Sequence, residues 1–414
     1  MRRDQYTIFS EGKIGTLMVS NRLIRSATWD PSILRKRRMT DEVVALYHRL
    51  AAGGIGLIIT GDFSVVPGGL LEEGAIGHRA CSYENVRIDG FDRLIEAVRG
   101  AASQCKIVAQ LSGDYMGVGP SDFPSPFRRD KLRLLSMEEM QSIVACFIES
   151  IAGMKKEGFD GVQLHAAHGG LLSLFLSPHT NRRTDEYGGP VENRARIVSE
   201  IVAGARERVG NYPILIKMNC TDYVQGGINI DNFPQLVKEI ARCGVDGIEV
   251  SGGMWDCLVR TEAELGFRPV PAPESHTRIA RAEQQSYFLE YVEGLALDVP
   301  LILVGGNRDV ERLEEIVKQG KVDFIAMSRP LISEPDLPKR WLEGRGSSGT
   351  DCVSCNSCIY DMWTRIEKEK AWVASCLMKH DRARVKRAQR WLSTWVKENT
   401  ITEYCPGKEN KEDS

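Results

Sequence analysis

Two histidines three residues apart, His165 and His168, are the side chains whose type and spacing most directly suggest chemistry. They follow a turn at Gly158–Gly161 and a short run, 162–165, whose apolar residues alternate as in a half-buried strand. The pair is therefore expected at, and just beyond, the carboxyl end of a strand. In a barrel of alternating strands and helices, catalytic groups collect at that end. One histidine alone is more often a satisfied, half-buried residue, but two at one strand end favour a functional site.

A second group of residues is typical of a phosphate site. Gly305-Gly306 follows one expected strand, and Ser328-Arg329 follows the next. Small residues at neighbouring strand ends let backbone N–H groups approach a phosphate, and an arginine adds a bidentate contact. Two glycines after a strand often form only a tight turn. Because Ser328-Arg329 occupies the corresponding place one strand later, the two pairs together predict that these four residues hold a cofactor phosphate.

The elements that must position these residues are short β-rich runs that alternate with longer amphipathic runs. Most intervals are too long for hairpins and suit crossover helices, so the sheet is expected to be parallel. Eight such units over about 330 residues favour an α/β fold, an eight-stranded parallel (β/α)8 TIM barrel, over an open doubly wound sheet. No G-x-G-x-x-G follows the first run, which argues against a dinucleotide-binding domain. The expected strands are Asn21–Thr28, Gly56–Thr60, Ile107–Leu111, Gly161–His165, Ile214–Lys217, Gly247–Ser251, Leu301–Val304 and Phe324–Met327.

Two of the expected helices carry clear boundary signals. Ser136 and Glu139 form a capping box, apolar residues follow at helical spacing, and Gly158 is the expected stop. Asp309 is expected to cap the run 310–318, and Gly320 is expected to end it.

Two long irregular segments, Ser112–Arg133 and Trp255–Gln285, interrupt the alternation and are expected to be substrate loops at the barrel mouth. The barrel pattern ends after Trp341, and Gly344–Gly349 is typical of a linker. We therefore expect two parts: a barrel formed by residues 1–343, and a C-terminal extension of residues 344–414 that contains cysteines and helices.

The composition argues against several classes of partner. Charged residues make up 27% of the 414 residues and the net charge is −2, so nothing indicates nucleic acid as a partner. We find no signal peptide and no apolar run long enough to cross a bilayer, and we expect no membrane partner. Eleven cysteines, an odd number, favour reduced thiols over a disulfide framework and hence a cytoplasmic location.

Several motifs together carry a resemblance. The chain contains His165-Ala-Ala-His168-Gly, Phe175-Leu-Ser-Pro178, Thr180-Asn-Arg-Arg-Thr-Asp-Glu-Tyr-Gly-Gly189, Glu192-Asn-Arg194, Val304-Gly-Gly306 and Met327-Ser-Arg-Pro-Leu-Ile332. In their order and spacing these motifs resemble the old yellow enzyme family of FMN-dependent oxidoreductases. The resemblance covers roughly residues 1–340.

The resemblance implies an FMN across the carboxyl face of the barrel, reduced by NAD(P)H. The implied cofactor contacts are Ser26, Ala27 and Thr28 at the first strand end, Gln110 at the pyrimidine edge, Lys217 near flavin N1 and O2, and Gly305, Gly306, Ser328 and Arg329 at the phosphate. In similar enzymes the paired histidines bind a substrate carbonyl, so that flavin N5 can deliver hydride to the β-carbon of an enone. His165 and His168 match that pair.

The chain departs from the family pattern in ways that bear on mechanism. Gly170 stands where similar enzymes place a tyrosine that protonates the α-carbon, and Trp29 and Ala27 replace other usual residues. The proton could instead come from Tyr115, Tyr223 or water, whereas Tyr187 belongs to a motif typical of a structural turn. Three hypotheses remain open: an ene reductase; a flavin-dependent dehydrogenase, demethylase or double-bond isomerase; and a non-catalytic barrel that binds flavin or a partner.

The extension contains two further patterns. Cys352, Cys355, Cys358 and Cys376 could ligate an iron-sulfur cluster or zinc, and they resemble the cluster site of the 2,4-dienoyl-CoA reductase branch. Both later gaps differ from that branch, so reduced thiols packed on the barrel are favoured and no metal ligand is assigned. The basic stretch Lys379–Lys397 is expected to dock its apolar stripe on its own domain or on a second copy of the chain in a homo-oligomer, rather than on an acidic membrane or partner.

Overall fold

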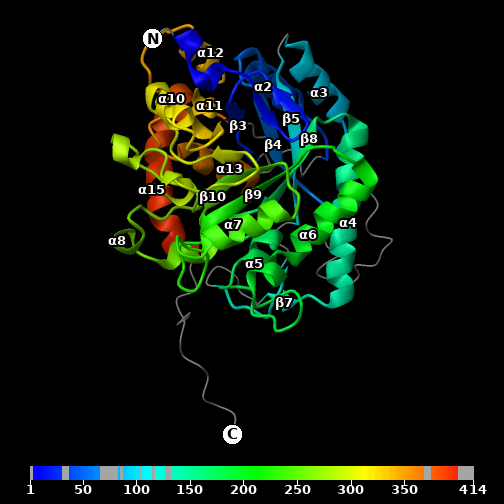
Figure 1. Cartoon of the computed structure of the whole chain (residues 1–414). Coiled ribbons are helices and arrows are strands. Elements are labelled where there is room, and N and C mark those ends of the chain that lie inside the picture. Colours follow the sequence, from blue (N-terminus) through cyan, green and yellow to red (C-terminus); the bar gives the residue numbers. More distant parts are fainter. Residues whose placement is uncertain are drawn as a thin grey trace.

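The computed structural model describes residues 3–29, 37–65, 83, 87–101, 104–113, 117–125, 132–367 and 374–399. At its centre is a closed barrel in which each strand is parallel to its neighbours (Figure 1). The barrel strands are β3 (Leu23–Arg25), β4 (Leu57–Ser64), β5 (Lys106–Ser112), β8 (Gly161–Ala166), β9 (Ile214–Thr221), β10 (Gly247–Gly252), β11 (Leu301–Leu303) and β12 (Phe324–Met327). The predicted (β/α)8 barrel is confirmed, with its strands in the expected runs.

The expectation of a half-buried strand before the histidines is wrong. Every residue of β8 is buried, because a barrel strand is covered on both faces. Val162 and Leu164 pack in the main apolar cluster, while the side chain of Gln163 bonds across the barrel to Glu249. The alternation in the sequence therefore separates two kinds of buried environment, one apolar and one polar.

The predicted helix boundaries are confirmed. Helix α4 (Met137–Glu157) begins with the capping box of Ser136 and Glu139 and ends at Gly158, which has a φ of 99°. Asp309 caps α10 (Val310–Lys318). The other long helices around the barrel are α2 (Asp41–Ala52), α3 (Phe91–Gly100), α6 (Val191–Val209) and α7 (Phe233–Arg242). Their apolar faces cover the outside of the sheet.

An N-terminal hairpin that the sequence pattern did not reveal lies at the amino-terminal ends of the barrel strands. Strands β1 (Gly12–Ile14) and β2 (Leu17–Val19) pair antiparallel. Ile14, Leu17 and Val19 pack against apolar residues from the barrel strands. The hairpin therefore fills one end of the barrel, which leaves the carboxyl ends of the strands as the place for a cavity.

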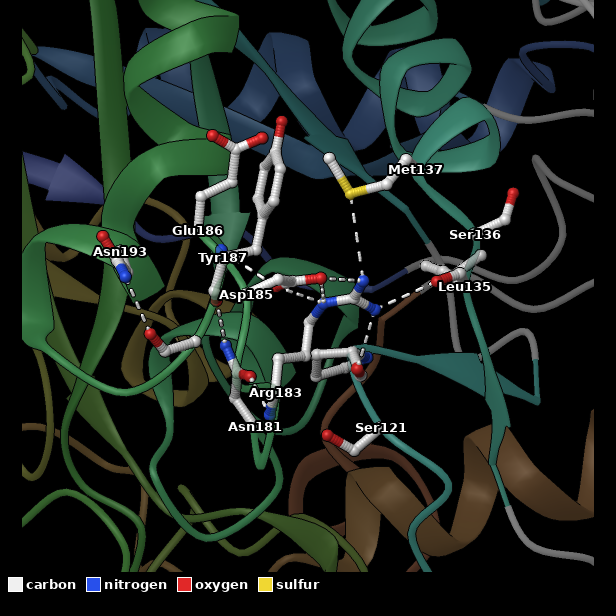
Figure 2. Close-up of polar contacts among 12 residues, drawn as sticks. Ser121, Leu135, Ser136, Met137, Asn181, Arg183, Asp185, Glu186, Tyr187 and Asn193 are labelled. Atoms are coloured by element: carbon white, nitrogen blue, oxygen red, sulfur yellow. Dashed lines mark hydrogen bonds and ion pairs between the residues drawn. The ribbon is translucent and has the colours of Figure 1, made fainter.

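The motif from Thr180 to Gly189 holds neighbouring loops together, and the expected turn within Thr184–Gly189 is present at residues 186–187. Arg183 forms an ion pair with Asp185 and donates hydrogen bonds to the carbonyls of Pro120 and Leu135, at 3.1 and 3.0 Å (Figure 2). The hydroxyl of Tyr187 donates a hydrogen bond to the carboxylate of Glu200. The motif thereby ties the loop of β6 (Val118–Gly119) and β7 (Arg133–Leu134) to the segment after α5 (Leu171–Leu176).

The remaining elements are short, apart from those of the extension. They are η1 (Arg3–Gln5), η2 (Thr7–Phe9), η5 (Trp255–Val259), α8 (Glu262–Leu265), η6 (Ala282–Gln284), α9 (Leu289–Val292), α11 (Arg329–Ser333), α12 (Leu337–Leu342), α13 (Ser357–Glu367), α14 (Leu377–His380) and α15 (Arg382–Asn399). Among the described residues, we find no helix that combines the length and apolarity needed to span a membrane.

Helix α15 docks on its own chain, as favoured from the sequence. Its Ala388 and Leu392 are buried, and Arg384 forms an ion pair of 2.6 Å with the fully buried Asp361 of α13. Gln389 donates to the carbonyl of Cys355 at 2.7 Å. The apolar stripe of the basic helix is thus used within the chain.

Candidate active site

A cavity of about 320 Å³ opens at the carboxyl ends of the barrel strands. It is lined by every residue that the sequence assigned to the site: Ser26, Ala27, Thr28, Gln110, His165, His168, Lys217, Gly305, Gly306, Ser328 and Arg329. The structure therefore brings both predicted groups, the histidines and the phosphate residues, to one cavity. The expected substrate loop at 255–285 also reaches it, through Trp255 and the segment Pro271–Ser275.

The two histidine rings lie side by side, with centroids 5.2 Å apart. His168 has a φ of 59°, a strained value for a residue with a side chain. Its backbone N–H donates to Asn219 Oδ1 at 3.1 Å, and its Nε2 lies 2.7 Å from Ser251 Oγ. His165 differs, because its buried Nδ1 has no partner within the described structure. Buried polar atoms rarely lack a hydrogen-bond partner, so this nitrogen indicates a site in which a bound ligand supplies the partner.

Both imidazoles are held in the neutral form. Burial lowers the pKa of His165 to about 3, and Lys217 adds to the effect. Burial also lowers the pKa of His168 well below its usual value, helped by His165 and Lys217. A neutral imidazole can donate one hydrogen bond to a ligand without carrying charge into the cavity.

Beneath the cavity a buried polar network crosses the barrel interior. Lys217 Nζ lies 3.1 Å from Glu249 Oε1 and donates to Ser26 Oγ at 2.9 Å. The Ser26 hydroxyl donates to the same carboxylate at 2.5 Å. Gln163 Nε2 donates to the other oxygen, Glu249 Oε2, at 2.7 Å, and Gln110 Nε2 donates to Gln163 Oε1 at 2.7 Å. Lys217, Ser26 and Gln110, all predicted cofactor contacts, are thus joined through Glu249 and Gln163.

The opposite end of the cavity is suited to an anion. Gly305 and Gly306 have φ values of 103° and 73°, and a Cβ on either would lie 2.7 to 2.8 Å from the ring of Tyr287. Only glycine fits both the backbone conformation and the space. The hydroxyls of Thr28 and Ser328 lie 2.8 Å apart on the same side.

Two arginines, Arg308 and Arg329, line the cavity together with this glycine pair. Burial lowers the pKa of Arg308, and the positive charge of Arg329 lowers it further, so the two cations lie close enough to repel each other. Arg308 Nε is buried and has no partner among the described groups. A phosphate would relieve the repulsion and accept from both side chains. Together with Gln110 and Lys217 at the other end, these residues fit FMN.

The C-terminal extension forms part of the cavity wall. Cys358, Ile359 and Met362 of α13 line it. Arg308 donates to the carbonyl of Cys352, and Arg329 donates to Asn356 Oδ1 at 2.5 Å. The two arginines of the anion end therefore also bind the extension.

Cys352, Cys355, Cys358 and Cys376 of the extension are free thiols in the structure. Burial raises the pKa of Cys358 to about 12, and the neighbouring Cys352, Cys355 and Cys376 act in the same direction. Within the described ranges, no three His, Cys, Asp or Glu side chains come together as a metal site. Elsewhere Cys146 of α4 forms a disulfide bond, so the expectation of reduced thiols is wrong at this position.

The candidates for a replacement proton donor fare differently. Tyr223 does not line the cavity; it packs against Phe267 and His276. Tyr115 lies outside the described residues. Gly170 has extended backbone angles, and a Cβ there would lie 3.7 Å from His165 Cδ2. The position of the absent tyrosine therefore borders His165 and has room for a Cβ atom.

Sequence reasoning missed several residues of the site. Arg308 lies two residues after the glycine pair, so the same argument that selected Arg329 could have found it. Glu249 was visible as a lone acid within an apolar strand run, and Gln163 as a polar residue in another. No sequence signal pointed to Glu274, which lines the cavity and whose pKa burial raises.

Comparison with known proteins agrees with this geometry. The chain matches the NADH:flavin oxidoreductase / NADH oxidase family over residues 7–347. It is 31% identical to an NADH oxidase of Thermoanaerobacter brockii over 85% of this chain and 53% of that protein. It is 30% identical to an NADPH dehydrogenase of Listeria innocua serovar 6a over 82% of this chain and 96% of the relative.

The fold matches that of a 2-naphthoyl-CoA reductase solved with 2-naphthoyl-CoA. The TM-score is 0.73 at 23% identity, over 92% of this chain and 58% of the other. This chain spans about half the length of the Thermoanaerobacter relative. Since the family match covers every barrel strand, the histidine pair and the phosphate residues, the chain belongs to the NADH:flavin oxidoreductase / NADH oxidase family, the old yellow enzyme family.

Proposed function

We propose that this protein is an FMN-dependent oxidoreductase that takes electrons from NADH or NADPH and reduces the activated double bond of a small enone. The observation that carries the proposal is the buried Nδ1 of His165, which lacks a partner beside a second neutral histidine in a cavity with an anion-binding end. The names of the relatives, an NADH oxidase and an NADPH dehydrogenase, support a nicotinamide reductant.

The cofactor assignments follow from the two ends of the cavity. Gly305, Gly306, Ser328 and Arg329 would hold the FMN phosphate, with Arg308 as a further contact. Ser26, Ala27 and Thr28 would touch the ring through backbone and side-chain groups, and Gln110 and Lys217 would meet its pyrimidine edge. When bound, FMN would supply the redox chemistry: it would accept hydride from the nicotinamide and donate hydride to the substrate.

The histidines would bind the substrate carbonyl. As neutral donors, His165 and His168 would hydrogen-bond its oxygen and draw electrons from the conjugated double bond. The two donors would already be aligned before the substrate binds. The strained backbone of His168, held by Asn219 and Ser251, supports a site that is formed before the substrate arrives.

The first experiment is spectroscopic. Purified protein loaded with FMN should be yellow, should bleach with NADH or NADPH under anaerobic conditions, and should regain colour when 2-cyclohexen-1-one is added. Folded protein that stays colourless and has no affinity for excess FMN contradicts the proposal. His165→Ala and His168→Ala should weaken the binding of a phenol that mimics the enolate, and unchanged binding would refute their role.

A second function is kept open by Gly170, which cannot donate a proton. The chain would then be a flavin-dependent dehydrogenase, demethylase or double-bond isomerase that uses the same cavity. Bleaching by NAD(P)H without any enone turnover would favour it. A third alternative, a non-catalytic barrel that binds flavin or a partner, predicts no reduction by NAD(P)H at a useful rate in a stopped-flow experiment.

We also propose that residues 1–343 form the FMN-binding barrel and that residues 344–414 form an extension serving the same site. The contacts of Arg308 with Cys352 and of Arg329 with Asn356 support a role for the extension at this site. An iron-sulfur cluster on the four cysteines is not favoured, because the last two gaps in their spacing depart from the cluster-binding branch.

A further inference from the structure

Glu249 is a buried acid that does not itself line the cavity, but it contacts two residues that do, Lys217 and Ser26. It lies on β10 with none of its surface exposed. Its two carboxylate oxygens are used in different directions: Oε1 faces Lys217 and Ser26, and Oε2 faces Gln163. Lys217 lies on β9, Gln163 lies on β8, and Ser26 directly follows β3. The carboxylate therefore sits where the polar groups beneath the cavity converge.

The first consequence concerns charge. Lys217 is 4% exposed, and a cation so buried needs a counter-ion close by. Glu249 supplies it at 3.1 Å, and the Ser26 hydroxyl bridges the two groups. A ligand above Lys217 therefore meets a paired ammonium, whose field at a distance is that of a dipole, in place of an isolated positive charge.

The second consequence concerns the direction of the amides. A carboxylate only accepts hydrogen bonds, so the NH₂ group of Gln163 must point toward Glu249 and its carbonyl oxygen must point away. That oxygen then accepts from the NH₂ group of Gln110. The carbonyl oxygen of Gln110 is thereby left for the cavity, where it can accept from an N–H of a ligand. The acid orients an amide two residues away along the chain of hydrogen bonds.

We propose that Glu249 is a positioning residue that sets both the charge and the hydrogen-bonding polarity presented to the pyrimidine edge of FMN. The proposal rests on the proposed function. An unpaired Lys217 would favour the reduced, more negative cofactor strongly. Pairing with Glu249 weakens that preference, so Glu249 lowers the reduction potential and makes the reduced cofactor a stronger hydride donor.

The test compares the affinity for oxidised FMN with the affinity for two-electron-reduced FMN, together with the midpoint potential. Glu249→Gln should raise the preference for reduced FMN at least tenfold, which corresponds to about 30 mV for a two-electron couple. Lys217→Met should shift the preference in the opposite direction. The double variant, which removes both charges, should lie within about threefold of the wild type.

Two controls separate this role from stability. Glu314→Gln removes a buried acid of α10 that does not line the cavity and that accepts hydrogen bonds from the backbone N–H groups of Thr7 and Ile8. It should leave the potential unchanged. If Glu249→Gln does not fold, the double variant still tests the inference. It is expected to fold because it contains no unpaired buried charge.

Three outcomes count against the inference. An unchanged potential in folded, flavin-loaded Glu249→Gln overturns it, and so does a double variant that behaves like Lys217→Met alone, because Glu249 would then have no effect of its own. If the wild-type protein binds no FMN, the proposed function fails first and the inference fails with it.

Discussion

Lowering the pH should destabilise this protein through His165, and the size of the effect follows from its burial. The residue is 9% exposed, and burial, with a smaller contribution from Lys217, lowers its pKa to about 3. In the unfolded chain the same imidazole takes up a proton below its ordinary pKa of about 6.5. The contribution of neutral His165 to the free energy of unfolding is therefore fully present above pH 6.5. It is lost as the pH falls from about 6.5 toward 3.

At pH 5 the unfolded-state pKa lies about 1.5 units above the pH, and each unit corresponds to about 1.4 kcal/mol. His165 alone should therefore reduce the free energy of unfolding by about 2 kcal/mol between pH 7 and pH 5. The pKa of His168 is lowered in the same direction, so it should add a loss of the same sign.

The assay is urea unfolding of the flavin-free protein at pH 7 and pH 5, with constant ionic strength. His165→Gln should lose about 2 kcal/mol less than the wild type between the two pH values. The control is His48→Gln, which removes an exposed histidine from α2 and should behave like the wild type. If His165→Gln and the wild type lose the same free energy, the imidazole is not held neutral by the fold, and the argument for a neutral donor is refuted.

Four further measurements address the site. Gly170→Tyr should speed reoxidation by 2-cyclohexen-1-one about 100-fold relative to Gly170→Phe, because a phenol can donate the missing proton; equal rates would show that no acid is needed there. Arg308→Gln should weaken FMN binding at least about tenfold while leaving riboflavin binding unchanged, since a hydrogen bond to a charged group contributes about 1.5–3 kcal/mol; equal losses for both ligands would argue against a phosphate contact. Gly306→Ala should lower both stability and FMN affinity, because its Cβ would meet the ring of Tyr287 at 2.8 Å. Anaerobically purified protein should contain neither iron nor acid-labile sulfide, and the presence of both would establish a cluster on the extension.

The local features of this protein were determined by its sequence. The capping box of Ser136 and Glu139 and the stop at Gly158 define α4 because each acts within one turn of helix. The strand runs could be recognised in the same way. The gathering of the site was also predictable, because the carboxyl ends of parallel barrel strands all meet on one face. Residues placed at those ends, such as His165, had to converge.

Only the tertiary structure decided which groups meet beneath and beside that face. Ser26 and Glu249 are 223 residues apart in the chain, and their contact depends on how deep each inward-facing side chain lies in the barrel. The same holds for Arg308 and Cys352, which join the barrel to the extension, and for Tyr223, which packs away from the cavity. A strand pattern tells which side chains point inward, but the tilt and stagger of the closed sheet set their heights, and these arise only when all the strands pair.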